Sequence, residues 1–315
     1  MRLMRGLQGL PALSGEAVTI GNFDGVHRGH QHVFRQLAKA AQARDLRTTA
    51  VVFEPQPQEY FRPGTVARLT TLREKVTALA AEPVDQILCL RFDAQLAAMD
   101  ARSFIDRVLV ERLGTRYLVV GDDFRFGNAR EGDFKQLSVA GSRCGFEVEA
   151  APTLTLEGAR VSSTRVRQLL AEGRMAEAAV LLGRPYSMTG RVRLGDQRGR
   201  TLGAPTANIA LDNRLLPVSG VFAARVRGPG GLVAPAVANA GTRPTVDGGH
   251  ASLEVHLLDF GGDLYGQRLA VDLLQQLRLE RRFASLQELK QQISLDIAAA
   301  RAWLETYPWQ SGAKT

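Results

Sequence analysis

Short apolar runs alternate with segments of helical periodicity along the first half of the chain. Runs typical of buried strands occur at Ala17–Ile20, Thr49–Phe53, Gln86–Leu90 and Tyr117–Val120. After the first run, apolar residues recur at helical spacing over Gly29–Ala43. Strands that alternate with helices indicate βαβ units, so we expect an α/β fold with a parallel sheet. Such a sheet binds ligands beyond the carboxyl ends of its strands, so motifs are expected in the segments that follow the runs.

The pattern changes near residue 183. Met175–Leu182 ends the helical periodicity, and a Gly-Arg-Pro sequence then interrupts it. Beyond this point, short alternating segments separated by Gly, Pro and Asp indicate a small antiparallel β-barrel. Ser285–Leu304 predicts a terminal helix that starts with a capping box. We therefore predict two domains, residues 1–183 and residues 184–315.

The composition is that of an ordinary globular protein. The 315 residues are 45% hydrophobic and 23% charged, which gives enough apolar mass for two cores. No apolar stretch has the length of a membrane span, and the N-terminal segment is too interrupted for a signal peptide. Cys89 and Cys144 cannot form a disulfide framework, which fits a reducing compartment. We expect a cytoplasmic protein with no membrane partner.

The formal net charge of +8 suits anionic partners. The arginines are nevertheless scattered, and neither a basic run nor an alternation of basic and aromatic residues is present. Nucleotide phosphates account for some of this charge, whereas a nucleic-acid partner would rest on net charge alone. The sequence carries no indication of the oligomeric state.

The first candidate site is the segment Gly21–His30, with the sequence GNFDGVHRGH, which joins the first strand to the first helix. Its glycines let the backbone approach a ligand, and the N–H groups of a helix N-terminus favour a phosphate. His27 and His30 are three residues apart and share one face of the first turn, where both can donate hydrogen bonds to a phosphate. Zinc bound by these histidines and His32 is the alternative, but no carboxylate or cysteine stands at a recognised ligand spacing.

Two further features point to the same chemistry. Hydroxyls and a guanidinium begin a predicted helix at Ser163, Thr164 and Arg165, where they form a second anion cradle. Alone, such a start is more often a helix cap. Aromatic residues follow the second and fourth predicted strands, in Phe53–Phe61 and in Gly121–Gly127, where they can cover a planar ring. Loop packing explains either segment taken alone.

The second candidate site is the loop Gly195–Asn208, which is rich in Gly and Arg and leads into a strand. The loop lacks the spacing of a Walker loop. The terminal sequence GAKT (Gly312–Thr315) resembles the end of a Walker loop, but it lacks the required spacing and a following helix. Glycines and arginines can still wrap a polyphosphate. The Thr206 hydroxyl and the Asn208 carbonyl suit Mg²⁺.

These motifs resemble two known families. GNFDGVHRGH is similar to the GxFDGxHxGH signature of nucleotidyltransferases, and with Val161–Arg167 and the two aromatic segments it resembles the adenylyltransferase module of prokaryotic FAD synthetases. The loop Gly195–Asn208 resembles the RGRxxGxPTAN motif of riboflavin kinases. Pro217–Ala223, Asn239–Thr245 and Leu253–Phe260 are similar to that family's PxxGVYA, NxGxRPT and VExHLLDF motifs.

The order of the motifs is that of the bifunctional riboflavin kinase/FAD synthetases, over roughly residues 15–303. The resemblance implies a Rossmann-like nucleotidyltransferase domain followed by a kinase barrel with a terminal helix. It implies phosphorylation of riboflavin to FMN by ATP, and then adenylylation of FMN to FAD, with riboflavin, FMN and ATP as partners and Mg²⁺ as cofactor.

Roles for particular residues follow from the same resemblance. Glu254 is the expected catalytic base of the kinase, His27 and His30 act in adenylyl transfer, and Thr206 and Asn208 hold the metal. The residues expected to bind ATP or flavin are Gly21, Asn22, Phe23, Asp24, Gly29, Asp123, Phe124, Ser163, Thr164, Arg165, Gly195, Arg198, Gly199, Arg200, Gly203, Pro205 and Asn239.

The sequence departs from the family pattern at three places. Ala204 stands where Phe is common, Phe222 where Tyr is common, and Gln275-Gln276 where a pair with a His is common. None of these is a residue to which chemistry is assigned. Two other functions stay open: a different nucleotidyltransferase, such as a cytidylyltransferase, with an attached barrel, and a non-catalytic flavin- or nucleotide-binding regulator.

Overall fold

The computed structural model describes residues 1–7, 13, 15–194, 205–211, 215–243 and 250–308. The chain forms two compact units, Met1–Val66 with Thr70–Ser163, and Ala67–Leu69 with Thr164–Thr315. We call them the α/β unit and the barrel unit. The division between the units falls between Ser163 and Thr164. The predicted domain boundary at residue 183 stays a prediction.

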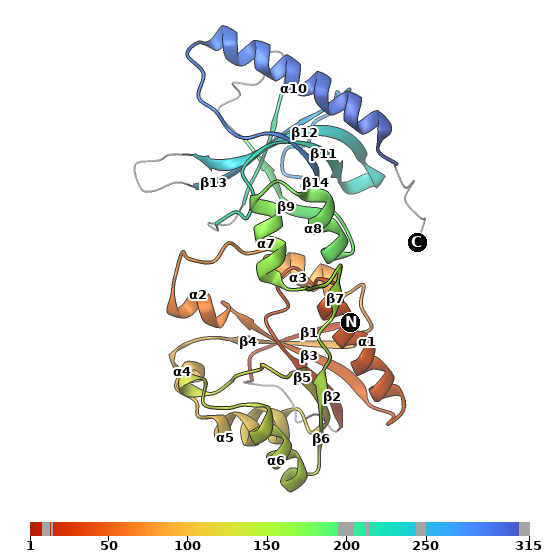
Figure 1. The fold of residues 1–315 in the computed structure, drawn as a ribbon, viewed down its shortest axis with the longest axis vertical. Helices are drawn as coiled ribbons and strands as arrows, with labels where there is room; N and C mark the ends of the chain where they lie inside the picture. Colours follow the sequence, from red (N-terminus) through yellow and green to blue (C-terminus); the bar gives the residue numbers. More distant parts are fainter. Residues whose placement is uncertain (8–12, 14, 195–204, 212–214, 244–249, 309–315) are drawn as a thin grey trace. The chain divides into compact units, whose positions relative to one another are not determined.

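The α/β unit contains a six-stranded sheet with helices on both faces (Figure 1). Its elements are β1 (Arg2–Arg5), β2 (Glu16–Ile20), α1 (Arg28–Gln42), β3 (Arg47–Glu54), α2 (Pro57–Phe61), α3 (Leu72–Leu79), β4 (Gln86–Arg91), α4 (Ala94–Ala97), α5 (Ala101–Phe104), the π-helix η1 (Ile105–Arg112), β5 (Thr115–Gly121), the 3-10 helix η2 (Asn128–Arg130), α6 (Phe134–Cys144), β6 (Glu147–Ala151), β7 (Thr155–Leu156) and β8 (Ala159–Arg160).

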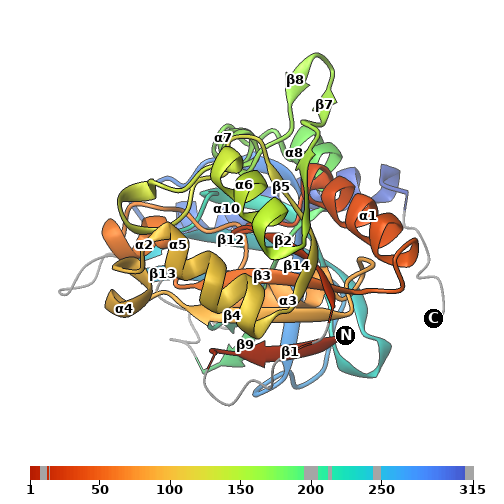
Figure 2. The same cartoon turned by 90° about the horizontal axis from the view of Figure 1, so that it is seen from below.

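All strands of the large sheet are parallel, in the order β1-β4-β3-β2-β5-β6. This confirms the predicted Rossmann-like parallel sheet. The strands β7 and β8 form a separate two-stranded hairpin, which projects as a narrow ribbon in Figure 2.

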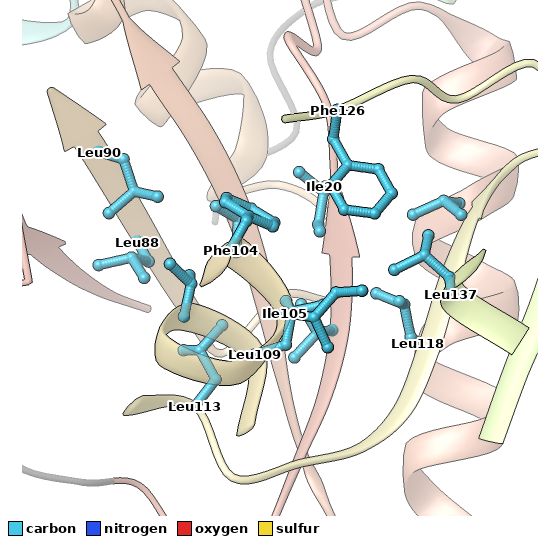
Figure 3. Close-up of a cluster of buried hydrophobic side chains, with 14 of the residues drawn as sticks. Ile20, Leu88, Leu90, Phe104, Ile105, Leu109, Leu113, Leu118, Phe126 and Leu137 are labelled. Atoms are coloured by element: carbon cyan, nitrogen blue, oxygen red, sulfur yellow. The ribbon is translucent and has the colours of Figure 1, made fainter. Parts of the chain in front are cut away.

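Alternation along the strands gives the sheet two apolar faces. Ile20 and Leu118 point to the face covered by α5, η1 and α6, where they meet Phe104, Leu109 and Leu137 (Figure 3). On the opposite face, residues of the same strands pack against α1 and α3. Burial of each large side chain in these layers contributes roughly 1.5–3 kcal/mol to stability. The two layers together therefore fix the sheet, including the strand ends that carry the motifs.

A topological switch point lies beside β2. This strand pairs with β3 on one side and with β5 on the other, so the connections that leave β2 and β5 run to opposite sides of the sheet. The crevice at such a point is where open parallel sheets bind ligands. The segment Gly21–His27 begins there, directly after β2.

The barrel unit is built around a closed antiparallel barrel with strand order β10-β13-β12-β11-β14-β9. This confirms the predicted barrel. Its elements are α7 (Ser163–Ala171), α8 (Met175–Leu182), β9 (Tyr186–Arg193), β10 (Ala207–Ile209), β11 (Gly220–Arg227), the 3-10 helix η3 (Pro229–Gly231), β12 (Val233–Arg243), β13 (His250–Leu257), β14 (Arg268–Arg278) and α10 (Leu286–Thr306). The small core contains Phe222, Ala238 and Val255, all fully buried.

Helices cover the outside of the barrel. The terminal helix α10 buries Ala300 and Leu304 against Ala223 and Leu274, and α8 packs on β9 and β14 (Figure 1). None of the described helices is both long and apolar enough to cross a membrane.

Three details differ from the sequence-based expectation. The sheet has two additional edge strands, β1 and β6. The sequence did not predict them because both are short and have partly polar patterns. Between β4 and β5, the α-helix α5 continues directly as the π-helix η1, whereas apolar residues at helical spacing predict an ordinary α-helix. At the start of α10, Ser285 caps Glu288 N–H as expected, but the Glu288 carboxylate accepts from Ala284 N–H and not from Ser285 N–H.

Candidate active sites

Two histidines form the N-terminal turn of α1. His27 is the N-cap residue, and its Nδ1 accepts a hydrogen bond from the His30 backbone N–H at 3.3 Å. The two rings are stacked, with centroids 3.6 Å apart. Because an accepting ring nitrogen carries no hydrogen, neutral His27 has its hydrogen on Nε2. That nitrogen is the one that can donate to a phosphate.

Gly29 lets this arrangement form. A Cβ added at residue 29 would lie 3.1 Å from the His27 ring and 3.3 Å from the Val161 carbonyl oxygen. Glycine therefore permits the close approach of the imidazole and of the chain that leads to Ser163. Phe23 supports the other histidine, since its ring lies edge-on to His30 at 5.2 Å between centroids.

The pKa of His30 is lowered well below its ordinary value of 6.5. Burial is the main cause, and the neighbouring His27 and Lys75 lower the pKa further by charge repulsion. Lys75 lies on α3 and is fully buried, although lysine side chains are seldom buried completely. His30 is thus neutral near pH 7 in the free protein.

A cavity of about 680 Å³ opens beside this turn at the carboxyl edge of the sheet. Gly21, Asn22, Asp123 and Phe124, all expected to bind ligand, line it. Phe53, Phe61, Arg125 and Phe126, which belong to the two predicted aromatic segments, line it as well. Phe92, Phe104, Arg62 and Arg130 also line it and were not singled out from the sequence. This lining suits a flat ring system that carries a phosphate.

The two N-terminal motifs meet at Asp24. The Ser163 hydroxyl donates to the Asp24 carbonyl oxygen at 2.9 Å, which joins residues 139 positions apart. The Asp24 side chain is buried and accepts from Thr70, so its carboxylate is engaged within the protein. Thr164 and Arg165 continue α7 in the barrel unit.

Asp123, in the loop after β5, pairs with Arg160 of β8 at 2.9 Å. Both side chains are more than half exposed. The pair links the loop that lines the cavity to the hairpin that precedes Ser163.

In the barrel, three polar residues stand in one row across three neighbouring strands. Glu254 of β13 lies opposite Asn208 of β10 on one side and opposite Asn239 of β12 on the other. Residues opposite one another on neighbouring strands project from the same face of the sheet. All three are half-buried, while their neighbours Ile209, Leu253 and Ala238 point into the barrel core.

The amide oxygen of Asn239 is buried and has no hydrogen-bond partner among the residues that the structure describes. An unsatisfied buried acceptor is costly, so it indicates a position where a ligand supplies a donor. The row thus brings together three predicted residues that are far apart in the sequence.

A second cavity, of about 310 Å³, lies next to this row. Pro205 and Thr206 line it together with Leu257, Phe260 and Tyr265. The predicted phosphate-loop residues Gly195, Arg198, Gly199, Arg200 and Gly203 lie outside the described residues.

Comparison with known proteins decides the family. A FAD synthetase family model matches residues 10–165, and a riboflavin kinase family model matches residues 182–304. The chain is 52% identical over 305 residues to the bifunctional riboflavin kinase/FMN adenylyltransferase of Pseudomonas fluorescens, covering 96% of this chain and 97% of that protein. It is 49% identical over 304 residues to the enzyme of the same name from Escherichia coli K12, with the same coverage.

The chain belongs to the family of bifunctional riboflavin kinase/FMN adenylyltransferases. The enzyme phosphorylates riboflavin and adenylylates FMN, in agreement with the resemblance found in the sequence. A solved structure named as a macrolide-efflux protein from Streptococcus pneumoniae also matches, with a TM-score of 0.83, 31% identity, and coverage of 96% of this chain and 99% of that chain.

Besides the cavity residues named above, sequence reasoning missed two residues that contact or influence the turn with the two histidines. Thr70 binds Asp24, and Lys75 acts on His30 through its charge. A signal existed for Lys75, because it lies at helical spacing between Leu72 and Leu79 on the apolar face of α3. Thr70 carries no such pattern.

Proposed function

We propose that residues 1–183 carry adenylyl transfer and residues 184–315 carry the kinase step. The observation that carries the assignment of the kinase site is the row Asn208–Glu254–Asn239, in which one carboxylate lies between two amides. The histidine pair His27–His30 at the start of α1 supports the assignment of the adenylyl-transfer site.

In the kinase step, Glu254 accepts the proton of the riboflavin 5′-hydroxyl as that oxygen attacks the γ-phosphorus of ATP. The bond to the bridging oxygen breaks and ADP leaves, so FMN is the product. Asn239 donates to or accepts from the flavin substrate beside Glu254. Pro205 and Thr206 border the cavity next to the row, which we assign to the nucleoside of ATP.

The residues present fit Mg²⁺. The Thr206 hydroxyl and the Asn208 amide oxygen are oxygen donors, which Mg²⁺ prefers. Asn208 lies in β10 and Thr206 directly precedes this strand, so in an extended chain these two residues, two positions apart, share a face. When bound, the ion offsets the negative charge of the ATP phosphates.

In the adenylyl-transfer step, the phosphate oxygen of FMN attacks the α-phosphorus of a second ATP. The bond to the β-phosphate oxygen breaks, which gives FAD and pyrophosphate. A phosphate monoester is largely ionised at neutral pH, so no strong base is needed. Alignment and charge stabilisation by His27, His30 and the α7 start account for the rate.

The cavity of about 680 Å³ is the site that we assign to FMN. The Phe53 and Phe61 rings lie 5.9 Å and 5.8 Å from the Phe92 ring, measured between centroids, so the three rings form one aromatic cluster. In this proposal the cluster covers the isoalloxazine ring. The ATP phosphates then lie at the N-terminus of α1. The residues of the α/β unit proposed to bind ATP there are Gly21, Asn22, Gly29 and Ser163.

We also propose a cytoplasmic location. Cys89 and Cys144 are both free thiols, which suits a reducing compartment.

A chromatographic time course with riboflavin, ATP and Mg²⁺ tests the assignment. The parent protein should convert riboflavin to FMN and then to FAD. Glu254→Ala should abolish FMN formation and keep conversion of supplied FMN to FAD, while His30→Ala should do the reverse. If Glu254→Ala still phosphorylates riboflavin near the parent rate, the assigned base is wrong. Loss of kinase activity in folded His30→Ala would contradict two separate sites.

A further inference from the structure

The segment that leads into the histidine pair has an unusual backbone. Phe23 and Val26 both have φ of +44°, in the left-handed region that side chains other than glycine rarely adopt. For Val26, whose β-carbon is branched, this conformation is a clear outlier. Val26 directly precedes His27, so its conformation sets the direction in which His27 enters α1. Such a backbone persists only where surrounding contacts hold it.

The Thr70 side chain supplies two of these contacts. Thr70 donates from Oγ1 to the Asp24 carboxylate at 3.0 Å, and the same Oγ1 accepts from the Gly25 backbone N–H at 3.1 Å. The Thr70 backbone N–H donates to the same Asp24 oxygen at 3.0 Å. Thr70 therefore binds both residues that lie between the two strained positions.

This network is sealed from solvent. Thr70 is 5% exposed and Asp24 is 2% exposed. A hydroxyl has a single hydrogen, and that of Thr70 is used on Asp24. Since both its donor and its acceptor serve the turn, Thr70 is not a ligand-binding group. Its effect on chemistry passes through the turn.

We propose that Thr70 is the positioning residue of the adenylyl-transfer site, holding Phe23–Val26 so that His27 and His30 face the ATP phosphates. Asp24 then serves as the partner of Thr70 within this support. The inference rests on the proposed phosphate-binding role of the two histidines. The inference adds Thr70 to the site, although this residue lies 40 positions or more beyond the motif Gly21–His30 in the sequence.

The decisive variants are Thr70→Val, which keeps the shape and removes the hydroxyl, and Thr70→Ser, which keeps the hydroxyl. Thr71→Val is the matched control, because the Thr71 hydroxyl caps α3 by accepting from Glu74 N–H and does not serve the turn. Each full-length variant is assayed for kcat and for the KM of ATP and FMN in adenylyl transfer. Riboflavin phosphorylation in the same sample reports on the integrity of the chain.

For Thr70→Val we expect kcat of adenylyl transfer to fall about tenfold or more and the KM of ATP to rise about fivefold, because small misplacements of aligned groups are costly. The KM of FMN and the kinase rate should stay within about twofold of the parent. Thr70→Ser should restore most of the loss. Thr71→Val should lower thermal stability and leave the KM of ATP unchanged.

An unchanged KM of ATP and kcat in Thr70→Val would overturn the proposal. Equal losses of both activities would overturn it as well, because Thr70 would then serve the fold as a whole. A failure of the underlying function looks different: His30→Ala would retain adenylyl transfer whatever Thr70→Val does.

Discussion

The ring of His27 lies on the ring of His30, with an angle of 18° between their planes. Two imidazoles in this arrangement cannot both carry a proton without strong repulsion, and the buried Lys75 adds a further positive charge nearby. The free site is therefore arranged for a ligand that brings negative charge, and ATP is such a ligand.

The pH dependence of stability follows from the lowered pKa of His30. In the unfolded chain His30 takes up a proton near pH 6.5, whereas in the folded protein it does so only at a much lower pH. Between these two pKa values the unfolded state binds more protons, so stability should fall as the pH drops below about 6.5. Thermal unfolding of the parent and of His30→Gln over this range measures it. The variant should show a flatter profile, and parallel profiles would contradict the assignment.

Asn239→Ala should separate stability from activity in the kinase site. The Asn239 amide oxygen makes no hydrogen bond among the described residues, so its removal should change the free energy of unfolding by less than about 1 kcal/mol. If the amide binds substrate, riboflavin phosphorylation should still fall about tenfold. Urea unfolding and kinase assays measure the two effects. A large loss of stability with full activity would show a purely structural role.

Phe61→Ala should weaken FMN binding in adenylyl transfer. Phe61 is 65% exposed and lines the aromatic cavity, so one face of its ring is available to stack on a planar ligand. Loss of one stacking surface should raise the KM of FMN about fivefold. Val139→Ala is the matched control, since Val139 is 64% exposed and is not a cavity residue. Equal KM values for the two variants would remove Phe61 from the site.

Asp272→Asn should destabilise the barrel. The Asp272 carboxylate is 1% exposed and accepts from both Arg225 and Arg227. Asparagine has no negative charge and only one acceptor oxygen, so the two buried ion pairs are lost, which should lower the free energy of unfolding by about 3 kcal/mol. Asp259→Asn removes an exposed pair with Arg301 and should change stability little. Calorimetry of both variants tests the contrast, and similar losses would contradict it.

The sequence predicted much of the fold because its signals were local. The short apolar runs located β2 to β5, and the helical spacing of apolar residues over Gly29–Ala43 located α1. The motif after the first strand identified His27 as a candidate by residue type, and the resemblance to the riboflavin kinase motif identified Glu254. In each case the information lies within one short stretch of the chain.

The sequence could not predict relationships that depend on register or on distant contacts. The position of Glu254 between Asn208 and Asn239 depends on the pairing of three strands. The support of Asp24 by Thr70 joins residues 46 positions apart. Neither relationship has a signature in spacing, because tertiary packing creates both.

The packing of α8 on β9 and β14 has a consequence for attempts to divide the enzyme. A shortened protein ending at Gly183 would keep α8 and lose both strands. The side chains of Met175, Leu181 and Leu182, now buried, would face water. Such a fragment should self-associate, and replacing these residues with polar ones is the route to a half-enzyme that stays monomeric.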